Sequence, residues 1–170
     1  ATSAIHLRDK LKITADEALR QAREGVALAK SLAAEVEFSA EDASRTDYAY
    51  LLEVLRAVHE AGASVLNVPD TVGYSLPHEY AELVRKLVRD IPTAVISVHC
   101  HNDLGLAVAN SIAAIGAEPP NEVLVGIEPH QVTADQQTAH FLDVPPSIAW
   151  PMCTYVRLAC LDEQGIARED

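Results

Sequence analysis

Short apolar runs alternate with longer amphipathic segments over residues 1–117 of this chain. Short runs rich in β-branched residues are typical of buried strands, whereas apolar residues that recur every three or four positions are typical of helices. This pattern predicts helices over residues 15–32, 46–61, 76–90 and 104–115, and strands over residues 35–39, 64–68 and 94–98.

Residues that start and stop helices support these boundaries. Thr14 and Glu17 have the spacing of a capping box, in which each side chain accepts a hydrogen bond from the other residue's amide. Gly62 is expected to end the second helix. Ser75 is expected to cap the third helix, with Pro77 in the first turn, where a missing amide costs little.

The predicted order is a strand followed by a helix, repeated at intervals of about thirty residues. Such a repeat predicts an α/β fold with a parallel sheet covered by helices. Polar residues end or follow each strand: Ser39 and Glu41, Asn67 and Thr71, and His99 and His101. A (β/α)8 barrel carries its chemistry at the carboxyl ends of many strands, whereas a doubly wound sheet gathers it at one switch point. The distribution of polar residues therefore favours a partial (β/α)8 TIM barrel.

The pattern changes after about residue 117. Six of the nine prolines fall in residues 118–170, and the strand–helix repeat is lost there. Because proline breaks helix interiors and central strands, we expect loops, with one strand over residues 123–127 and a short helix near residues 152–161. We therefore divide the chain into a partial TIM-barrel domain, residues 1–117, and a divergent proline-rich tail, residues 118–170.

Composition excludes several classes of function. The 170 residues are 49% hydrophobic and carry a formal net charge of −12. That acidity argues against a nucleic-acid partner and against an anionic membrane surface, because both need clustered lysine and arginine. No apolar run approaches the length needed to span a membrane.

The cysteines and the first residue bear on where the protein works. Cys100, Cys153 and Cys160 are too few and too irregularly spaced for a disulfide framework, so we expect a reducing compartment. We expect a cytoplasmic protein, or a mitochondrial or plastid one in a eukaryote. The chain starts at Ala1 rather than at a methionine, which we interpret as a processed or incomplete N-terminus.

The stretch Val98-His-Cys-His-Asn-Asp-Leu-Gly105 holds the strongest candidate for chemistry. Side chains alternate along a strand, so His99 and His101 should share one face while Cys100 points to the other. Two imidazoles so placed can bind one divalent metal ion, although His-x-His alone is a weak indicator. The alternative is that both are polar strand-end residues with hydrogen-bond partners. Asp103 is expected to cap the following helix.

Four ordered motifs resemble 2-isopropylmalate synthase, with homocitrate and citramalate synthases as close relatives. They are Ala1-Thr-Ser-Ala-Ile-His6, Val36-Glu-Phe-Ser-Ala-Glu-Asp42 with Arg45-Thr-Asp47, Asn67-Val-Pro-Asp-Thr-Val-Gly-Tyr74 and Val98-His-Cys-His-Asn-Asp-Leu-Gly-Leu-Ala-Val-Ala-Asn110. Their order and spacing are specific to this group of Claisen-condensing TIM-barrel enzymes, and less decisive among the individual synthases. A lyase or aldolase of the same barrel superfamily is a further alternative.

The resemblance implies an acyltransferase of leucine biosynthesis that joins acetyl-CoA to the 2-oxo acid 2-oxoisovalerate. It implies that His99 and His101 bind zinc, magnesium or manganese, and that the full-length relatives form homodimers. It also implies a substrate pocket formed by His6, Ser39, Glu41, Asn67 and Thr71. Within that pocket His6, at the end of a strand, and Glu41 would be catalytic, and Thr71 would lie beside the oxo-acid carboxylate.

This chemistry is physically coherent. A metal ion on the ketone oxygen withdraws electron density from the carbonyl carbon, which the acetyl group attacks once a base has removed a methyl proton. The cation stabilises the developing alkoxide, and hydrolysis of the thioester then releases CoA.

Two features of the family are not found in the sequence. One is an arginine–aspartate pair on the first strand, which includes a third metal ligand, and the other is a Gly-x-Gly-Glu-Arg-x-Gly-Asn segment. The sequence instead continues as Gly116-Ala-Glu-Pro-Pro120, a break that a frameshift, a retained intron or an alternative exon would explain. A half-barrel would also leave strand edges unpaired. We therefore expect weak or absent catalysis from this chain alone, with a catalytically inactive metal-binding or interaction fragment as the alternative.

Overall fold

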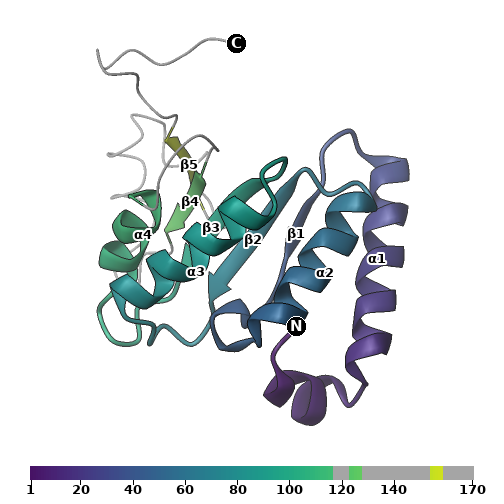
Figure 1. Ribbon diagram of the computed structural model, residues 1–170, viewed down its shortest axis with the longest axis horizontal. Coiled ribbons are helices and arrows are strands. Elements are labelled where there is room, and N and C mark those ends of the chain that lie inside the picture. Colours follow the sequence, from purple (N-terminus) through teal and green to yellow (C-terminus); the bar gives the residue numbers. More distant parts are fainter. Residues whose placement is uncertain (117–122, 128–153, 159–170) are drawn as a thin grey trace, which may run out of the picture.

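The computed structural model describes residues 1–116, 123–127 and 154–158 (Figure 1). The elements in chain order are the π-helical segment η1 (His6–Leu11), α1 (Ala15–Leu32), β1 (Glu37–Ser39), the 3₁₀ segment η2 (Ala43–Arg45), α2 (Tyr48–Glu60), β2 (Val65–Asp70), α3 (Pro77–Asp90), β3 (Val95–Cys100), α4 (Ala107–Ile115), β4 (Val123–Ile127) and β5 (Thr154–Leu158). Strands and helices alternate from α1 to β4, as the hydrophobic pattern predicted. The described residues form an α/β fold.

The five strands make one sheet in the order β1-β2-β3-β4-β5. Strands β1 to β4 run parallel, and β5 runs antiparallel to β4. Ser39 pairs with Asn67, which pairs with Ser97, so three strands are in register along one line. Within the described residues β1 pairs only with β2, and it is therefore an edge strand.

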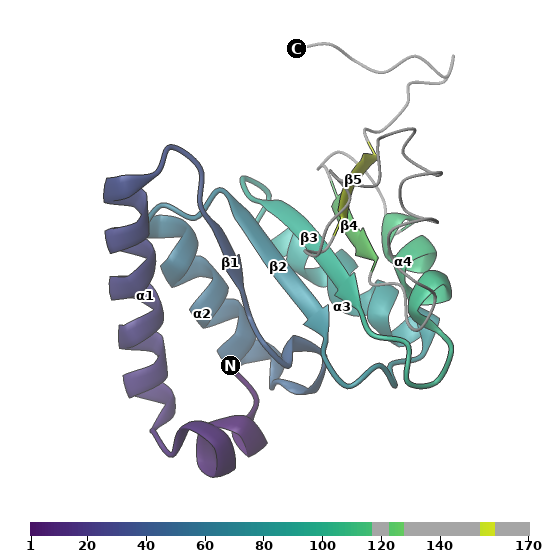
Figure 2. The same cartoon turned by 180° about the vertical axis from the view of Figure 1, so that it is seen from behind.

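The helices cover one face of the sheet. Figures 1 and 2, taken from opposite sides, both place α2 and α3 on the same side of β2 and β3. The strand residues Leu66, Val68, Ile96 and Val98 are fully buried, and they join one core cluster with residues from all four α-helices. The helical members of this cluster are Val26, Leu51, Val54, Leu55, Val58, Tyr80, Val84, Leu87, Val88, Ala107 and Ala114. Helices on one face are the arrangement of a barrel wall, whereas a doubly wound sheet carries helices on both faces.

Local signals place several helix ends correctly. Helix α1 has the predicted bounds, and Thr14 Oγ1 accepts a hydrogen bond from the Glu17 amide at 3.2 Å. Only this half of the predicted capping box forms, because the Glu17 carboxylate accepts hydrogen bonds from Arg20 and Gln21. Gly62 follows α2 with a φ of 119°, and Pro77 begins α3.

Two predicted caps are wrong. The N-cap of α3 is Leu76, and the Ser75 hydroxyl instead donates a 2.9 Å hydrogen bond to the buried carboxylate of Asp70. A buried carboxylate needs hydrogen-bond donors, which explains why Ser75 points there. Helix α4 begins at Ala107, and the Ala107 amide donates to Asn102 Oδ1 at 3.1 Å rather than to Asp103.

Two strands are longer than predicted. Strand β2 continues through Pro69 to Asp70, where a turn was expected, and β3 continues through His99 to Cys100. Pro69 pairs with His99 and Asp70 with Cys100, so each strand extends the other. His99 therefore lies inside a strand and not beyond its end.

The two ends of the chain bring one confirmation and two corrections. Strand β4 confirms the strand predicted over residues 123–127. Strand β5 replaces the short helix predicted near residues 152–161, in agreement with the strand propensity of Thr154 and Val156. Residues 1–5 form no strand and His6 begins η1, so the prediction that His6 ends a strand is wrong. The Thr2 amide instead donates to the Glu41 carbonyl oxygen at 3.0 Å. Other expectations for the tail lie outside the described residues.

No helix in the described part of the chain is long and apolar enough to cross a membrane. Helix α1 has 18 residues, but charged side chains such as Asp16, Glu24 and Lys30 interrupt it.

Candidate active site at the carboxyl ends of the strands

A row of hydrogen-bonded polar side chains crosses β1, β2 and β3. Ser39 Oγ donates to Asn67 Oδ1 at 2.9 Å, and Asn67 Nδ2 donates to Ser97 Oγ at 2.9 Å. Paired residues of neighbouring strands point to the same face of a sheet, and here that face is opposite the helix-packed core. The structure therefore brings together two predicted pocket residues, Ser39 and Asn67, and adds Ser97, which sequence reasoning missed.

The histidine pair lies on this same face. His99 is two residues beyond Ser97 on β3, and alternation along the strand gives the two side chains a common face. The ring centroids of His99 and His101 are 5.0 Å apart, and the ring planes are tilted by 40°. Cys100 belongs to the opposite, core-packed face, and burial raises the pKa of its thiol to about 11.

The donor chemistry of the pair fits a divalent metal ion. Imidazole nitrogen is the commonest protein ligand for zinc and similar ions. Within the ranges that the structure describes, no group of three or more histidine, cysteine, aspartate or glutamate side chains is placed to hold a metal. Among the described residues, His99 and His101 are therefore a pair of candidate ligands and not a complete metal site.

Two backbone hydrogen bonds join β2 and its following loop to the loop that carries His101. The His101 amide donates to the Asp70 carbonyl oxygen and the Leu104 amide to the Gly73 carbonyl oxygen, both at 3.2 Å. Gly73 has a φ of 63°, and a Cβ there would lie 2.8 Å from the His101 carbonyl oxygen and 2.5 Å from Asp103 Oδ2. Only glycine fits this close approach between the two loops.

The Asp70 carboxylate ties three parts of the chain together. It is fully buried and accepts hydrogen bonds from Ser44 Oγ (2.8 Å), Ser75 Oγ (2.9 Å), the Ser75 amide (3.1 Å) and Asn110 Nδ2 (3.4 Å). These partners come from η2, the β2–α3 loop and α4. The loops at this end of the sheet are thereby held to one another.

Thr71, a predicted pocket residue, contacts Asp42. The Asp42 amide donates to Thr71 Oγ1 at 2.8 Å. Asp42 is fully buried, has a φ of 68°, and accepts two 2.7 Å hydrogen bonds from Arg45 and another from Ser3 Oγ. Burial raises the pKa of Asp42, but the hydrogen bonds from Arg45 and Ser3 outweigh it, and the net shift is downward. Asp42 is therefore a buried anion.

His6 and Glu41 also lie beside Asp42. His6 Nδ1 is 3.8 Å from Glu41 Oε1 and 3.7 Å from Asp42 Oδ2, and this buried atom has no hydrogen-bond partner among the residues that the structure describes. Lys10 Nζ donates to Glu41 Oε1 at 2.5 Å, and this hydrogen bond lowers the pKa of Glu41. Glu41 is therefore a carboxylate at neutral pH, next to an imidazole.

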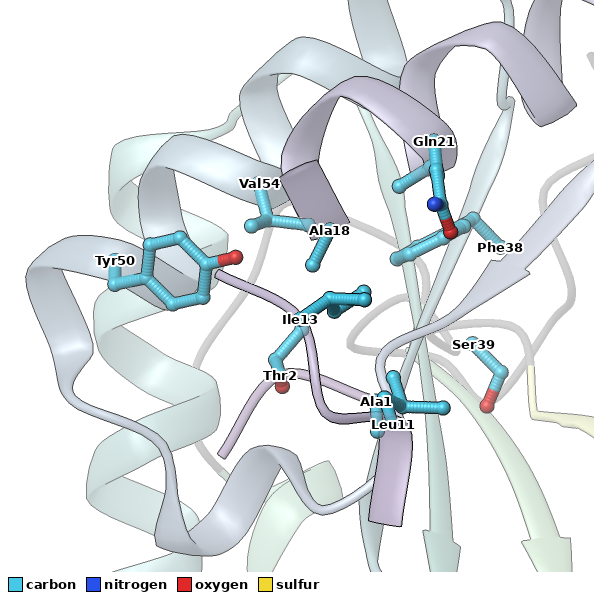
Figure 3. A pocket seen from close by; sticks show the side chains of 11 residues that line it. Ala1, Thr2, Leu11, Ile13, Ala18, Gln21, Phe38, Ser39, Tyr50 and Val54 are labelled. Carbon is cyan, nitrogen blue, oxygen red and sulfur yellow. The ribbon is translucent and has the colours of Figure 1, made fainter. Parts of the chain in front are cut away.

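A cavity of about 230 Å³ lies between η1, α1, α2 and the edge strand β1 (Figure 3). Apolar side chains such as Phe38, Ile13 and Val54 form most of its wall, and Ser39 also borders it. Ser39 thus belongs both to the cavity wall and to the polar row.

Sequence reasoning missed the two buried acids that organise this site, Asp42 and Asp70. One signal was available for Asp42, because Arg45 follows it at a spacing that suits an ion pair within one turn. The partners of Asp70 are up to 40 positions away in the sequence, so no local pattern identifies them.

Parallel strands with helices on one face, and with polar side chains on the other face from mid-strand to the carboxyl ends, define part of a TIM barrel. The family model described as HMGL-like matches residues 1–118, and the chain belongs to this family. The chain accordingly forms a partial HMGL-like TIM-barrel domain.

Individual relatives agree with this assignment. A 2-isopropylmalate synthase of Dictyoglomus turgidum is 58% identical over 123 residues, which cover 69% of this chain and 24% of that protein. The 2-isopropylmalate synthase 1 of Caldanaerobacter subterraneus subsp. tengcongensis is 57% identical over 118 residues, 68% of this chain and 30% of that protein. The Pyrococcus furiosus 2-isopropylmalate synthase is 53% identical over 120 residues, 69% of this chain and 24% of that protein. The predicted resemblance to 2-isopropylmalate synthase is confirmed, and the chain spans between 24% and 30% of the length of these relatives.

Among solved structures, the carboxyl transferase domain from Rhizobium etli pyruvate carboxylase, with pyruvate and biocytin, gives a TM-score of 0.43 at 22% identity. The match covers 55% of this chain and 16% of that chain.

Proposed function

We propose that this chain carries the metal-binding and 2-oxo-acid-binding part of a 2-isopropylmalate synthase-type acyltransferase, in which acetyl-CoA condenses with 2-oxoisovalerate. One observation carries the proposal: the His99–His101 pair lies on the same sheet face as the row of Ser39, Asn67 and Ser97. Family membership and the identity to 2-isopropylmalate synthases support the choice of substrates.

The extent of the barrel is part of the proposal. The sequence suggested about strands three to six of the barrel in residues 1–117, but residues 1–5 form no strand. We therefore assign β1, β2 and β3 as strands four to six, with their helices, and residues 118–170 as a divergent proline-rich tail. The end of the family match at residue 118 supports this boundary, although β4 continues the parallel sheet to Ile127. In the complete enzyme we expect a homodimer in the cytoplasm.

His99 and His101 would hold the divalent metal ion, zinc, magnesium or manganese. When bound, the metal supplies Lewis-acid polarisation of the ketone oxygen of the 2-oxo acid.

The remaining residues would bind and orient the substrate. Thr71 Oγ1 accepts a hydrogen bond from the Asp42 amide, which leaves its own O–H to donate to the oxo-acid carboxylate. Ser39 and Asn67 hold each other in one orientation, which fixes the wall of the pocket. These groups are set before the substrate arrives, so little ordering is needed on binding.

Glu41 and His6 would move the proton. Lys10 keeps Glu41 ionised, so Glu41 can accept the proton that leaves the methyl group of acetyl-CoA. His6 Nδ1 lies 3.8 Å from Glu41 Oε1, so an N–H at Nδ1 would face that carboxylate and leave Nε2 to take up a proton.

Binding and turnover measured on the full 170-residue chain test the proposal. In calorimetry we expect 2-oxoisovalerate to bind only when Zn²⁺ is present, and shorter and longer 2-oxo acids to bind more weakly. We expect release of free CoA thiol to be weak, because the chain spans only 24% of a full-length relative. Thr71→Val removes the hydroxyl at nearly constant volume. It should weaken the binding of the oxo acid but not the binding of Zn²⁺. If neither Zn²⁺ nor the oxo acid binds, the proposal is wrong and the interaction-fragment alternative stands.

A further inference from the structure

Two candidate site residues that are far apart in sequence, His6 and Thr71, both lie against Asp42. Asp42 itself was not expected to belong to the pocket. Its backbone has the left-handed values φ 68° and ψ 31°, which aspartate tolerates better than most residues. In this conformation the Asp42 amide donates to Thr71, and the Asp42 carboxylate accepts hydrogen bonds from Ser3 and Arg45.

We propose that Asp42 is a positioning residue that fixes the hydrogen-bonding state of both His6 and Thr71. It would hold His6 as the tautomer with its proton on Nδ1, so that Nε2 carries the lone pair. It would hold Thr71 with one lone pair occupied, so that the hydroxyl hydrogen is left for a ligand. This inference rests on the proposed function, because it assigns these two residues to the 2-oxo-acid site.

The first step of the argument is that the Asp42 carboxylate is fixed in position. Its Oδ1 accepts from Arg45 Nε and its Oδ2 from the terminal Arg45 nitrogen, each at 2.7 Å, and Ser3 Oγ adds a third donor. A paired guanidinium holds a carboxylate in both distance and angle. Because Asp42 is 0% exposed, water does not compete for these contacts.

The second step concerns His6. Its Nδ1 is a buried atom that no described residue hydrogen-bonds, and it faces two carboxylate oxygens at 3.7 and 3.8 Å. A lone pair on Nδ1 would face negative charge, whereas an N–H there would be attracted to it. The group that one ring nitrogen faces determines which nitrogen carries the proton. Nδ1 is therefore the protonated nitrogen of the neutral ring.

The third step decides between the two carboxylates. Each carboxylate is paired with a cation, Glu41 with Lys10 and Asp42 with Arg45, but the Glu41 side chain is 36% exposed. Asp42 is buried, and it shares Ser3 Oγ with His6, whose amide donates to that hydroxyl at 3.3 Å. The buried group acts through a lower local dielectric, so Asp42 has the stronger influence on the ring.

Nitrogen-15 NMR of the full chain with labelled histidine tests the proposal, since the two tautomers give distinct ring-nitrogen shifts. The His6 signal is assigned by its loss in H6Q. In the ligand-free wild type, at a pH where the ring is neutral, we expect the proton on Nδ1. In D42N the amide group presents a donor to Nδ1, and the ratio of the two tautomers should change by about tenfold or more. The wild-type spectrum alone overturns the proposal if it shows the proton on Nε2, whether or not D42N folds.

Two controls separate positioning from general damage. D90N also removes a carboxylate that pairs with an arginine and a hydroxyl, but on the outer helices, and it should leave the His6 tautomer unchanged. E41Q should change it by less than D42N does, and the reverse order would assign the role to Glu41 and overturn the proposal. The tautomer is measured without ligand, so failure of wild-type protein to bind 2-oxoisovalerate would count against the proposed function and not against Asp42.

Discussion

The ring centroids of His99 and His101 lie 5.0 Å apart, and the two rings share the sheet face that the helices leave uncovered. Strand alternation places His99 on this face, and the ring of His101, which follows the end of β3, lies beside it. The loop after β2 then holds the following residue through the hydrogen bond from the His101 amide to the Asp70 carbonyl oxygen. The geometry of the pair therefore depends on the backbone of two neighbouring strands and on the loop between β2 and α3.

Gly73→Ala should disturb the His99–His101 pair, although Gly73 does not belong to the pair. The new Cβ would lie 2.8 Å from the His101 carbonyl oxygen, and the φ of 63° is unfavourable for alanine. We expect a loss of about 1–3 kcal/mol in the free energy of unfolding, measured in urea, together with weaker Zn²⁺ binding.

Gly25→Ala is the matched control for that substitution. Gly25 lies in the middle of α1, and a Cβ there meets nothing within 4 Å. Alanine is the better helix former, so we expect the free energy of unfolding to rise by about 0.5–1 kcal/mol and Zn²⁺ binding to stay unchanged. Equal effects of the two substitutions would contradict the close approach of the two loops.

Asn67→Ala should be more costly than Ser39→Ala. Asn67 is 1% exposed, and its loss leaves the hydroxyls of Ser39 and Ser97 without their shared partner. We expect the free energy of unfolding to fall by about 1–3 kcal/mol in Asn67→Ala. It should fall by about 0.5–1 kcal/mol in Ser39→Ala, which loses one hydrogen bond at an exposed position. Urea unfolding of the two variants measures this order, and the reverse order would show that the polar row is not held through β2.

The stability that Asp90 contributes should disappear in acid. Hydrogen bonds from Arg89 and from the Tyr48 hydroxyl lower the pKa of Asp90 from 3.8 to about 2. Because the folded-state pKa lies below the unfolded one, this stabilisation is fully present above pH 3.8 and is lost as the pH falls towards 2. The difference in Tm between wild type and D90N should therefore be largest above that window and shrink within it. A difference that stays constant down to pH 2 would contradict the assignment.

Cys100 should be unreactive in the folded chain. Burial raises the pKa of its thiol to about 11, so almost no thiolate forms at neutral pH, and the side chain is 0% exposed. In a C153S/C160S variant, a disulfide reagent should label the remaining thiol only after denaturant is added. Rapid labelling in native buffer would show that β3 does not present Cys100 to the core.

Local patterns predicted the elements whose ends are set locally. Helix α1 has the predicted bounds because the Thr14 cap and the apolar spacing act within a few residues. The predicted ends of β2 and β3 came before the observed ends, because Asp70 and His99 are polar and resemble loop residues. Pairing between the two strands determines those ends, and a single segment does not contain that information.

The same distinction explains what could be predicted of the candidate site. Alternation was enough to predict that His99 and His101 lie together, and their rings are neighbours although His101 follows the end of β3. The roles of Asp42 and Asp70 depend on contacts 26 to 40 positions away, with Ser3, Ser44 and Asn110. Such contacts exist only once the loops of different strands meet at one end of the sheet.

Calorimetric titration of Zn²⁺ into the untagged 170-residue chain tests the central claim most directly. We expect about one ion per chain, and we expect H99A and H101A each to weaken binding by at least about tenfold. H78A is the matched control, because His78 is an exposed histidine of α3, and it should bind as the wild type does. Wild-type affinity in both H99A and H101A, or no binding of Zn²⁺ by the wild type itself, would contradict the account.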